Sequence, residues 1–226
     1  MVKILVNFPS RSRPQKFFKI LNDYHSKSSG KYDIHYYIKI DADDKTMNND
    51  MVKERIKSMG ISYQLDILTD CKGKIDAINR GINGKDFDIL ISIADDLNVL
   101  ENNWDDIIVH DMDPDFSICL NYKSDERVII FTDLIVIPVI GKKLYDRFGY
   151  IYHPDYMSEW CDNEQTQVCY SLGKLAIYDT CIIQHQWTHE PFDELHARNE
   201  NREMYDVDRI TFEKRAAINF DLGAVS

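Results

Sequence analysis

The sequence predicts an α/β fold, a three-layer sandwich in which helices cover a mostly parallel central sheet. In the first half of the 226-residue chain, four apolar runs alternate with three amphipathic segments, which is the pattern of a parallel sheet with right-handed crossovers. The fourth run, residues 87–93, is almost continuously apolar, as expected for a strand that is buried on both faces. This run ends abruptly in two adjacent carboxylates, Asp95 and Asp96.

The elements of the first half follow from apolar periodicity and from turn residues. We expect strands over residues 2–8, 32–40, 61–68 and 87–93, and helices over residues 15–26, 49–59 and 75–82. The sequence contains no internal repeat and no clear linker, so we expect a single domain over residues 1–226. Residues 1–100 would form a ligand-binding half, and residues 101–226 would form a second half with a C-terminal tail.

The second half is less regular. We expect helices over residues 104–110, 141–148, 159–172 and 209–220, and strands over residues 115–121, 127–131, 175–178 and 181–184. Residues 134–140 are apolar but contain Pro138, so they predict an edge strand or an irregular buried segment. Residues 185–202 are polar and predict a loop, and the tail from Asp193 to Arg215 could fold over a bound ligand as a lid.

Composition excludes some classes of function. The formal net charge of −11 argues against a general nucleic-acid binder, which needs a basic face. It leaves room for a small phosphate-bearing ligand, because a few cations, helix N-termini and a metal can hold one in an acidic protein. The five cysteines form no CxxC pair, no apolar run reaches the length of a membrane span, and the N-terminus lacks the pattern of a signal peptide. We therefore expect a cytoplasmic protein with reduced thiols.

Polar residues follow each of the first four predicted strands. They are residues 9–13, Asp41 with Asp43, residues 70–74, and Asp95 with Asp96. Because ligands of open α/β sheets bind beyond the carboxyl ends of the strands, these four segments can line one pocket. Together they offer a carboxylate for a base or ribose, cations for phosphates, and oxygen ligands for a hard divalent cation. That set suits a nucleoside diphosphate.

Each feature also has a plainer interpretation. An Asp-rich turn commonly caps the next helix, and loop arginines are most often solvated. The aromatic residues of the second half could bind a sugar, although core packing is the commoner role of aromatic side chains. They are Tyr150, Tyr152, Tyr156, Trp160 and Trp187.

Six segments in order along residues 2–190 resemble nucleotide-sugar glycosyltransferases of the family 2 type, which have the GT-A (Rossmann-like) fold. In the first half they are PSRSRP at 9–14, DCKGKIDAINRGI at 70–82 and ADDLNV at 94–99. In the second half they are FGYIY at 148–152, SEWCDNE at 158–164 and IQHQWTH at 183–189. Each motif is weak alone, and their order makes the set informative. The sequence departs from the family at Ala94, where many relatives have a third acidic residue.

The resemblance implies a donor site and a metal site. Asp96 would be the preferred direct metal ligand, and Asp95 would either share the metal or face the ribose. An imidazole ligand favours Mn²⁺ over Mg²⁺, and His185 is preferred to His189 because it follows an apolar strand. The residues implied near the nucleotide are Pro9, Ser10 and Arg11 at the nucleoside, Asp41 at the base, and Lys72, Gly73, Lys74 and Asn79 near the ribose or diphosphate. Arg198, Arg202 or Arg215 of the tail could also reach a phosphate.

An inverting transfer needs one carboxylate to take the proton of the acceptor hydroxyl. The resemblance implies Asp162 as this base, with Glu164 as the second candidate. The alternative is that both acids only decorate the first turn of a helix, where acidic residues are common.

The sequence thus predicts a metal-dependent, inverting glycosyltransferase that moves a sugar from a nucleoside-diphosphate sugar, with a UDP-sugar preferred, to a glycan or glycoconjugate acceptor. Two alternatives stay open. A sugar-phosphate nucleotidyltransferase also pairs a nucleotide site with a metal held by aspartates, but it usually has a Gly-rich loop after the first strand. A non-catalytic nucleotide-sugar-binding protein would keep the same residues as remnants.

Overall fold

The structure is a computed structural model that describes residues 1–124, 134–186, 194–199 and 201–223. Seven strands of this part of the chain form the central sheet: β1 (Lys3–Ser10), β2 (Asp33–Asp41), β3 (Tyr63–Leu68), β4 (Ile89–Ser92), β6 (Cys119–Tyr122), β7 (Val139–Gly141) and β8 (Leu175–Tyr178). Their order across the sheet is β3-β2-β1-β4-β7-β6-β8. Strands β3, β2, β1 and β4 are parallel, and β7 runs antiparallel to both of its neighbours. The predicted α/β fold with a mostly parallel sheet is confirmed.

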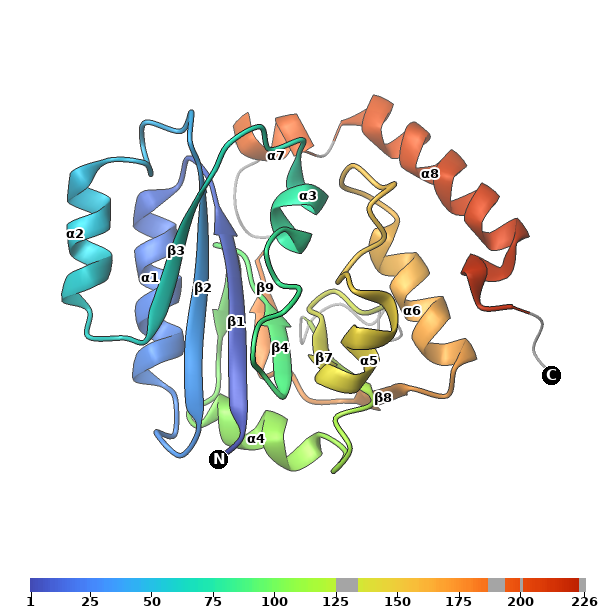
Figure 1. Ribbon diagram of the computed structural model, residues 1–226, viewed down its shortest axis with the longest axis horizontal. Helices are drawn as coiled ribbons and strands as arrows, with labels where there is room; N and C mark the ends of the chain where they lie inside the picture. Colours follow the sequence, from blue (N-terminus) through green and yellow to red (C-terminus); the bar gives the residue numbers. More distant parts are fainter. Residues whose placement is uncertain (125–133, 187–193, 200, 224–226) are drawn as a thin grey trace.

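Helices cover both faces of the sheet (Figure 1). On one face, α1 (Pro14–Ser26), α2 (Asp50–Ser58) and α4 (Trp104–Asp111) contribute buried side chains to one hydrophobic cluster. On the other face, α3 (Lys74–Asn79), α5 (Lys142–Phe148) and α6 (Cys161–Ser171) contribute to a second cluster. None of the helices in the described part of the chain has the length and the apolar character needed to cross a bilayer.

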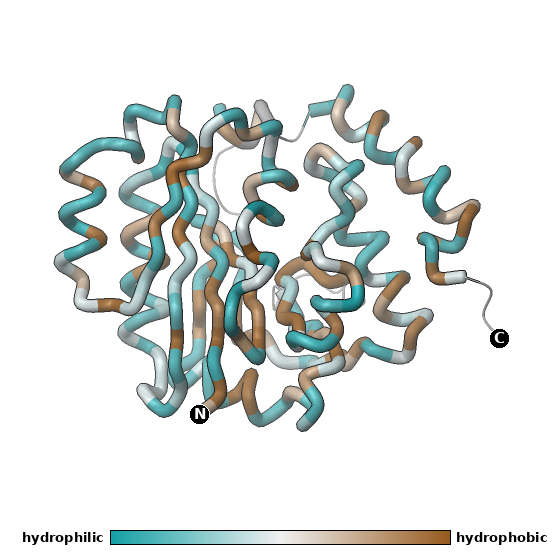
Figure 2. The backbone as a smooth tube through the Cα atoms, in the orientation of Figure 1, coloured by the Kyte–Doolittle hydropathy of each residue, from teal (hydrophilic) through white to brown (hydrophobic). Residues whose placement is uncertain are grey.

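The alternation of side chains along β1 explains the two clusters. Ile4, Val6 and Phe8 belong to the first cluster, whereas Leu5 belongs to the second, because successive side chains of a strand point to opposite faces. Both faces are covered, so the central strand β4 is buried at all four of its positions, whereas Figure 2 shows hydrophobic and hydrophilic positions mixed along other strands of the sheet.

Pro138 lies immediately before β7, a strand in the interior of the sheet, so the predicted edge strand is wrong. The other expectation, an irregular buried segment, holds for residues 134–138, which precede a three-residue strand. Proline is tolerated there because its missing N–H falls outside the ladder, while its carbonyl oxygen accepts a hydrogen bond from Ser92 N at 3.2 Å. The strand expected over residues 127–131 lies outside the described residues.

The C-terminal part differs most from the expectation. Residues 185–202 are not only a loop, because they include α7 (Glu194–Asn199), and the terminal helix α8 (Arg202–Ala217) begins seven residues earlier than expected. Figure 1 shows α8 running along the outer side of α6. A short two-stranded sheet also joins the halves, because β5 (Leu97–Val99) pairs with β9 (Ile183–His185).

Candidate active site

A cleft of about 510 Å³ lies at the carboxyl ends of β1, β2 and β4. Its walls come from both halves of the chain, since residues that follow these strands meet residues from the start of α6 and from β9. The lining includes Pro9, Ser10, Arg11, Arg13, Lys39, Asp41, Cys71, Gly73, Lys74, Asp95, Asp96, Tyr152, Ser158, Glu159, Asp162 and His185. Each of the four strand-end segments predicted to line one pocket contributes to this lining, although Asp43 and Lys72 do not line it themselves.

One end of the cleft is built on the carboxylate that ends β2. Arg11 Nη1 donates to Asp41 Oδ2 at 2.7 Å and to Asp43 Oδ1 at 2.6 Å, and its Nη2 donates to Asp43 Oδ2 at 2.9 Å. Asp43 is exposed, whereas Asp41 is half-buried at the cleft wall. Arg11 is thus held between two carboxylates rather than solvated, and this fixes the loop after β1 against the end of β2.

The two adjacent aspartates have different surroundings. Asp95 is buried, and it accepts hydrogen bonds from Arg13 Nη1 at 2.8 Å and from Ser10 Oγ at 3.3 Å. Burial raises the pKa of Asp95, and the bond from Arg13 opposes that shift. Arg13 is itself buried at the start of α1. Asp95 therefore holds the loop after β1 in place through its bonds with Arg13 and Ser10.

Asp96 faces His185 from the second half of the chain. The β5–β9 pairing places Leu97 opposite His185, and Gln186 N donates to Asp96 O at 3.0 Å. These backbone contacts bring His185 Nε2 to 3.6 Å from Asp96 Oδ2. Burial alone would raise the pKa of Asp96, but His185, with Lys74 and Arg13, outweighs burial and holds this pKa at about 2.

These two side chains could hold a divalent cation. A carboxylate oxygen and an imidazole nitrogen suit Mn²⁺, and diphosphate oxygens and water can complete the coordination of such an ion. Within the described part of the chain, no group of three His, Cys, Asp or Glu side chains has the arrangement of a metal site. Asp96 and His185 would therefore supply only part of the coordination sphere, and a bound nucleotide and water would supply the remaining ligands. His189 lies outside the described residues.

Asp162 lies in the first turn of α6 and lines the cleft from the side of the second half. Its Oδ1 accepts a hydrogen bond from Asn163 N at 2.8 Å. Burial raises the pKa of this carboxyl, and the Asn163 N–H, Lys74 and His185 act in the opposite direction. Lys74, the first residue of α3, thus acts on both Asp96 and Asp162.

Glu164 lies in the same first turn, but it does not line the cleft. Its side chain is 3% exposed and accepts two bonds from Arg215, from Nε at 2.6 Å and from Nη2 at 2.7 Å. Tyr156 Oη donates a third bond at 2.7 Å. The structure therefore separates the two acidic candidates: Asp162 reaches the cleft, and Glu164 ties α6 to α8. Arg215, one of the expected phosphate contacts, is engaged in this pair.

Breaking this pair has a predictable effect on stability. Arg215→Met is expected to lower the free energy of unfolding by about 3–5 kcal/mol, because it leaves a buried carboxylate without its cation. Urea denaturation followed by circular dichroism measures the loss. The control is Arg209→Met, which removes a more exposed pair with Glu213 on the same helix and is expected to change stability by about 1 kcal/mol or less. A loss below about 1 kcal/mol for Arg215→Met would contradict this role.

Two predicted nucleotide contacts do not line the cleft. Asn79 Nδ2 donates to Tyr152 O at 2.6 Å, and its Oδ1 accepts from Ile151 N at 2.9 Å and from Tyr152 N at 3.2 Å. Asn79 thus ties α3 to the second half. Lys72 lies before α3, where its N–H donates to Asp76. Gly73 does line the cleft, and it adopts a φ of 151° that favours glycine.

Most of the candidate sugar-binding aromatics pack elsewhere. Tyr152 lines the cleft, whereas Tyr156 is buried against Glu164 and Trp160 packs against α8. Tyr150 lines a second, smaller cavity, and Trp187 lies outside the described residues. Packing thus accounts for Tyr156 and Trp160, and Tyr152 is the one described member of this group that lines the cleft.

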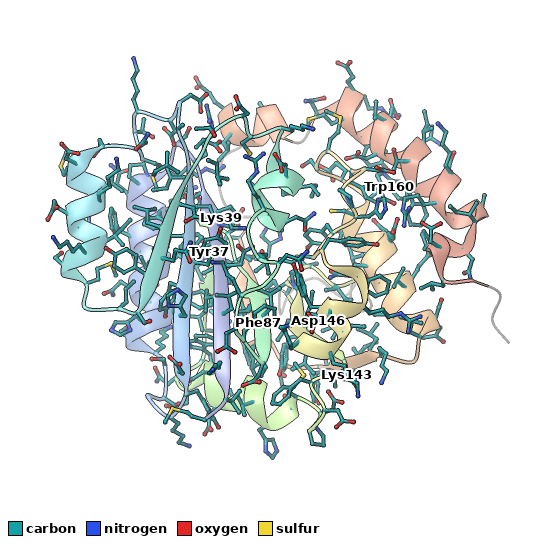
Figure 3. The ribbon with its side chains drawn as sticks, in the orientation of Figure 1. Tyr37, Lys39, Phe87, Lys143, Asp146 and Trp160 are labelled. Atoms are coloured by element: carbon teal, nitrogen blue, oxygen red, sulfur yellow. The ribbon has the colours of Figure 1, made fainter. Side chains whose placement is uncertain are left out.

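Sequence reasoning missed Lys39, a fully buried lysine of β2 that lines the cleft. Its Nζ donates to Ala77 O and Ile78 O, both at 2.9 Å, and so holds the end of α3 (Figure 3). Burial lowers the pKa of Lys39 to about 7. The sequence did contain an indication of this role, because a lysine within a largely apolar strand is rarely buried unless its ammonium group has hydrogen-bond partners.

Comparison with known proteins identifies the class of fold to which this architecture belongs. No family model matches the chain, and no curated protein matches it in sequence. Solved structures of glycosyltransferases do match it, and they define its class of fold: the chain has the GT-A fold.

Three of these structures illustrate the likeness. The mannosyltransferase PcManGT from Pyrobaculum calidifontis, in complex with GDP-Man and Mn²⁺, superposes with a TM-score of 0.68 at 12% identity over 86% of this chain and 59% of that one. TarS from S. aureus, residues 1–349 in complex with UDP-GlcNAc, gives 0.65 at 13% identity over 92% and 65%. Glucosyl-3-phosphoglycerate synthase from Mycobacterium tuberculosis, in complex with Mn²⁺, UDP-glucose and phosphoglyceric acid, gives 0.62 at 14% identity over 96% and 80%. The chain thus spans about three-fifths to four-fifths of these proteins.

Proposed function

We propose that the chain is a metal-dependent, inverting glycosyltransferase that moves a sugar from a nucleoside-diphosphate sugar, preferably a UDP-sugar, to a hydroxyl of a glycan or glycoconjugate. One observation carries this proposal: a single cleft at the carboxyl edge of the sheet holds Asp95, Asp96 and His185 together with Asp162. The GT-A fold, shared with proteins crystallised with nucleotide sugars and Mn²⁺, supports it.

The residues of the first half suit the donor. Pro9, Ser10 and Arg11 would border the nucleoside, and Asp41 would accept a hydrogen bond from the base. Gly73 and Lys74 would face the diphosphate, since Lys74 places a cation beside the metal-binding carboxylate. In this proposal Lys72 and Asn79 support the donor site from outside the cleft, through the loop before α3 and through Tyr152.

A bound Mn²⁺ (or Mg²⁺) would be held by Asp96 and His185, and it would stabilise the charge on the leaving nucleoside diphosphate. Asp95 would act differently from Asp96. Its contacts with Arg13 and Ser10 fix the loop after β1, so its role is to orient the donor site rather than to provide a second strong ligand.

Asp162 would take the proton of the acceptor hydroxyl as that oxygen bonds to the anomeric carbon and the bond to the diphosphate oxygen breaks. Asp162 lines the same cleft as Asp96 and Lys74, and this position suits the role. The raised pKa of Asp162 makes it a stronger base than an ordinary aspartate. Glu164 is not assigned this role, because Arg215 and Tyr156 occupy its carboxylate.

Product analysis tests the proposal. Incubation of the protein with Mn²⁺ and UDP-glucose, UDP-GlcNAc or GDP-mannose is expected to release the nucleoside diphosphate, through slow hydrolysis when water replaces the acceptor. Addition of a suitable sugar acceptor is expected to yield a glycoside of inverted anomeric configuration. Formation of pyrophosphate from a nucleoside triphosphate and a sugar phosphate would instead identify a nucleotidyltransferase. Tight donor binding without any turnover would identify a binding protein.

A further inference from the structure

One face of α8 lies against the segment that leads into α6. Tyr205, Asp208, Phe212 and Arg215 are spaced by three, four and three residues, so they share one face of the helix. All four contact residues between 157 and 164. This is the segment that carries Asp162 into the cleft.

Asp208 makes the central contact and is 0% exposed. Its Oδ1 accepts a hydrogen bond from Met157 N at 2.9 Å, and its Oδ2 accepts from Ser158 N at 2.8 Å and from Glu159 N at 2.7 Å. Three successive backbone N–H groups thus converge on one carboxylate. Such a set of donors binds an anion, and charge-assisted bonds of this kind are stronger than neutral ones. Two of these residues, Ser158 and Glu159, line the cleft themselves.

Trp160 makes the turn between this loop and α6. It adopts a positive φ of 59°, which a non-glycine residue keeps only where its surroundings hold it. Its ring packs against Tyr205 and Phe212 with centroid distances of 5.5 and 5.2 Å, and Figure 3 shows it beside α8. The same helix therefore holds the loop by Asp208 and the turn by its aromatic side chains. Asp162 follows this turn by two residues.

We propose that Asp208 is a positioning residue for the transfer reaction: by holding the backbone of residues 157–159, it sets where Asp162 stands in the cleft. The inference rests on the proposed role of Asp162 as the base. Among the described residues, the hydrogen bonds of Asp208 go to the backbone of residues 157–159, so we expect its loss to act on the position of Asp162 more than on donor binding.

Asp208→Asn tests the proposal. The asparagine keeps the size of the side chain but turns one acceptor into a donor that faces backbone N–H groups. We expect kcat to fall by about 10- to 100-fold, the loss that a displacement of about 1 Å can cause, with donor KM and Mn²⁺-dependent UDP affinity within about twofold of the wild type. The matched control is Asp206→Asn on the same helix, whose partner is the exposed Arg202; its kcat is expected to stay unchanged. A wild-type kcat in Asp208→Asn, or a donor KM that rises together with the loss of kcat, would overturn the proposal.

Hydrogen exchange provides a readout that does not depend on turnover. The amides of residues 157–159 are expected to exchange at least about tenfold faster in Asp208→Asn than in Asp206→Asn, while those of β1 and β2 stay unchanged. Unchanged exchange at these amides would overturn the proposal. If the wild type releases no nucleoside diphosphate from any donor, the proposed function fails, whereas this exchange result still reports on the contact itself.

Tyr205→Leu covers the case in which Asp208→Asn does not fold. Tyr205 is half-exposed, so its replacement loosens Trp160 with little loss of core. A severalfold fall in kcat with an unchanged donor KM would support the positioning role of this face of α8, and a wild-type kcat would contradict it.

Discussion

Asp162→Asn is expected to lower kcat for sugar transfer by about 10²–10⁴-fold, because the amide cannot take the proton of the acceptor hydroxyl. Donor binding is expected to persist, since the donor loops and Asp96 lie on other elements. Steady-state kinetics of nucleoside diphosphate release, together with calorimetry of UDP binding, measure the two effects. The control is Asp155→Asn, an exposed acid seven residues earlier that does not line the cleft. Transfer at the wild-type rate in Asp162→Asn would place the base elsewhere.

The same assignment has a pH signature. The base works in its ionised form, and burial raises the pKa of Asp162 above the ordinary value of about 3.9. Activity at saturating metal and donor should therefore be full above this raised pKa and should fall as the pH drops through it. The residual activity of Asp162→Asn should lack this acid limb.

Asp96→Ala is expected to abolish the dependence of UDP binding on Mn²⁺. The carboxylate would be a direct ligand, and even the loss of a residue that only supports a ligand lowers metal affinity by about 10- to 100-fold. The affinity for UDP in the presence of Mn²⁺ should therefore fall by at least about 10-fold, to the value measured without metal. Calorimetric titration measures it, with Asp86→Ala, an exposed acid far from the cleft, as the control. An undiminished effect of Mn²⁺ on UDP binding would contradict the metal assignment.

The first half of the fold was predictable because each of its elements carries its own periodic signal. Strand β4 reads as an apolar run in the sequence, and α1 buries Phe17, Phe18, Leu21 and Tyr24 at helical spacing. The parallel order then follows from the crossovers, which bring the strand ends to one edge. For the same reason Asp41, Asp95 and Asp96 could be assigned to one pocket from the sequence.

The second half was less predictable because its packing depends on charged residues. Helix α8 buries Asp208 and Arg215, so it lacks the apolar stripe that would reveal its start and its buried face. Strands β5 and β9 have three residues each, too few to show a period. The pairing of these two strands places His185 beside Asp96, which only the motif order of the family suggested.

The different surroundings of neighbouring acidic residues could not be predicted from the sequence either. Asp95 differs from Asp96 because Arg13, more than 80 residues away along the chain, folds back onto it. Glu164 differs from Asp162 because Arg215 pairs with it from α8. In both pairs the two residues are the same or similar, and, in the residues that the structure describes, an arginine from a distant part of the chain forms an ion pair with only one of the two carboxylates.

Calorimetric titration of the protein with UDP, GDP and dTDP, each with and without Mn²⁺, tests the central claim most directly. The account predicts that at least one of these nucleotides binds, that UDP is preferred, and that Mn²⁺ strengthens binding. The absence of detectable binding by all three nucleotides in the presence of Mn²⁺ would contradict it.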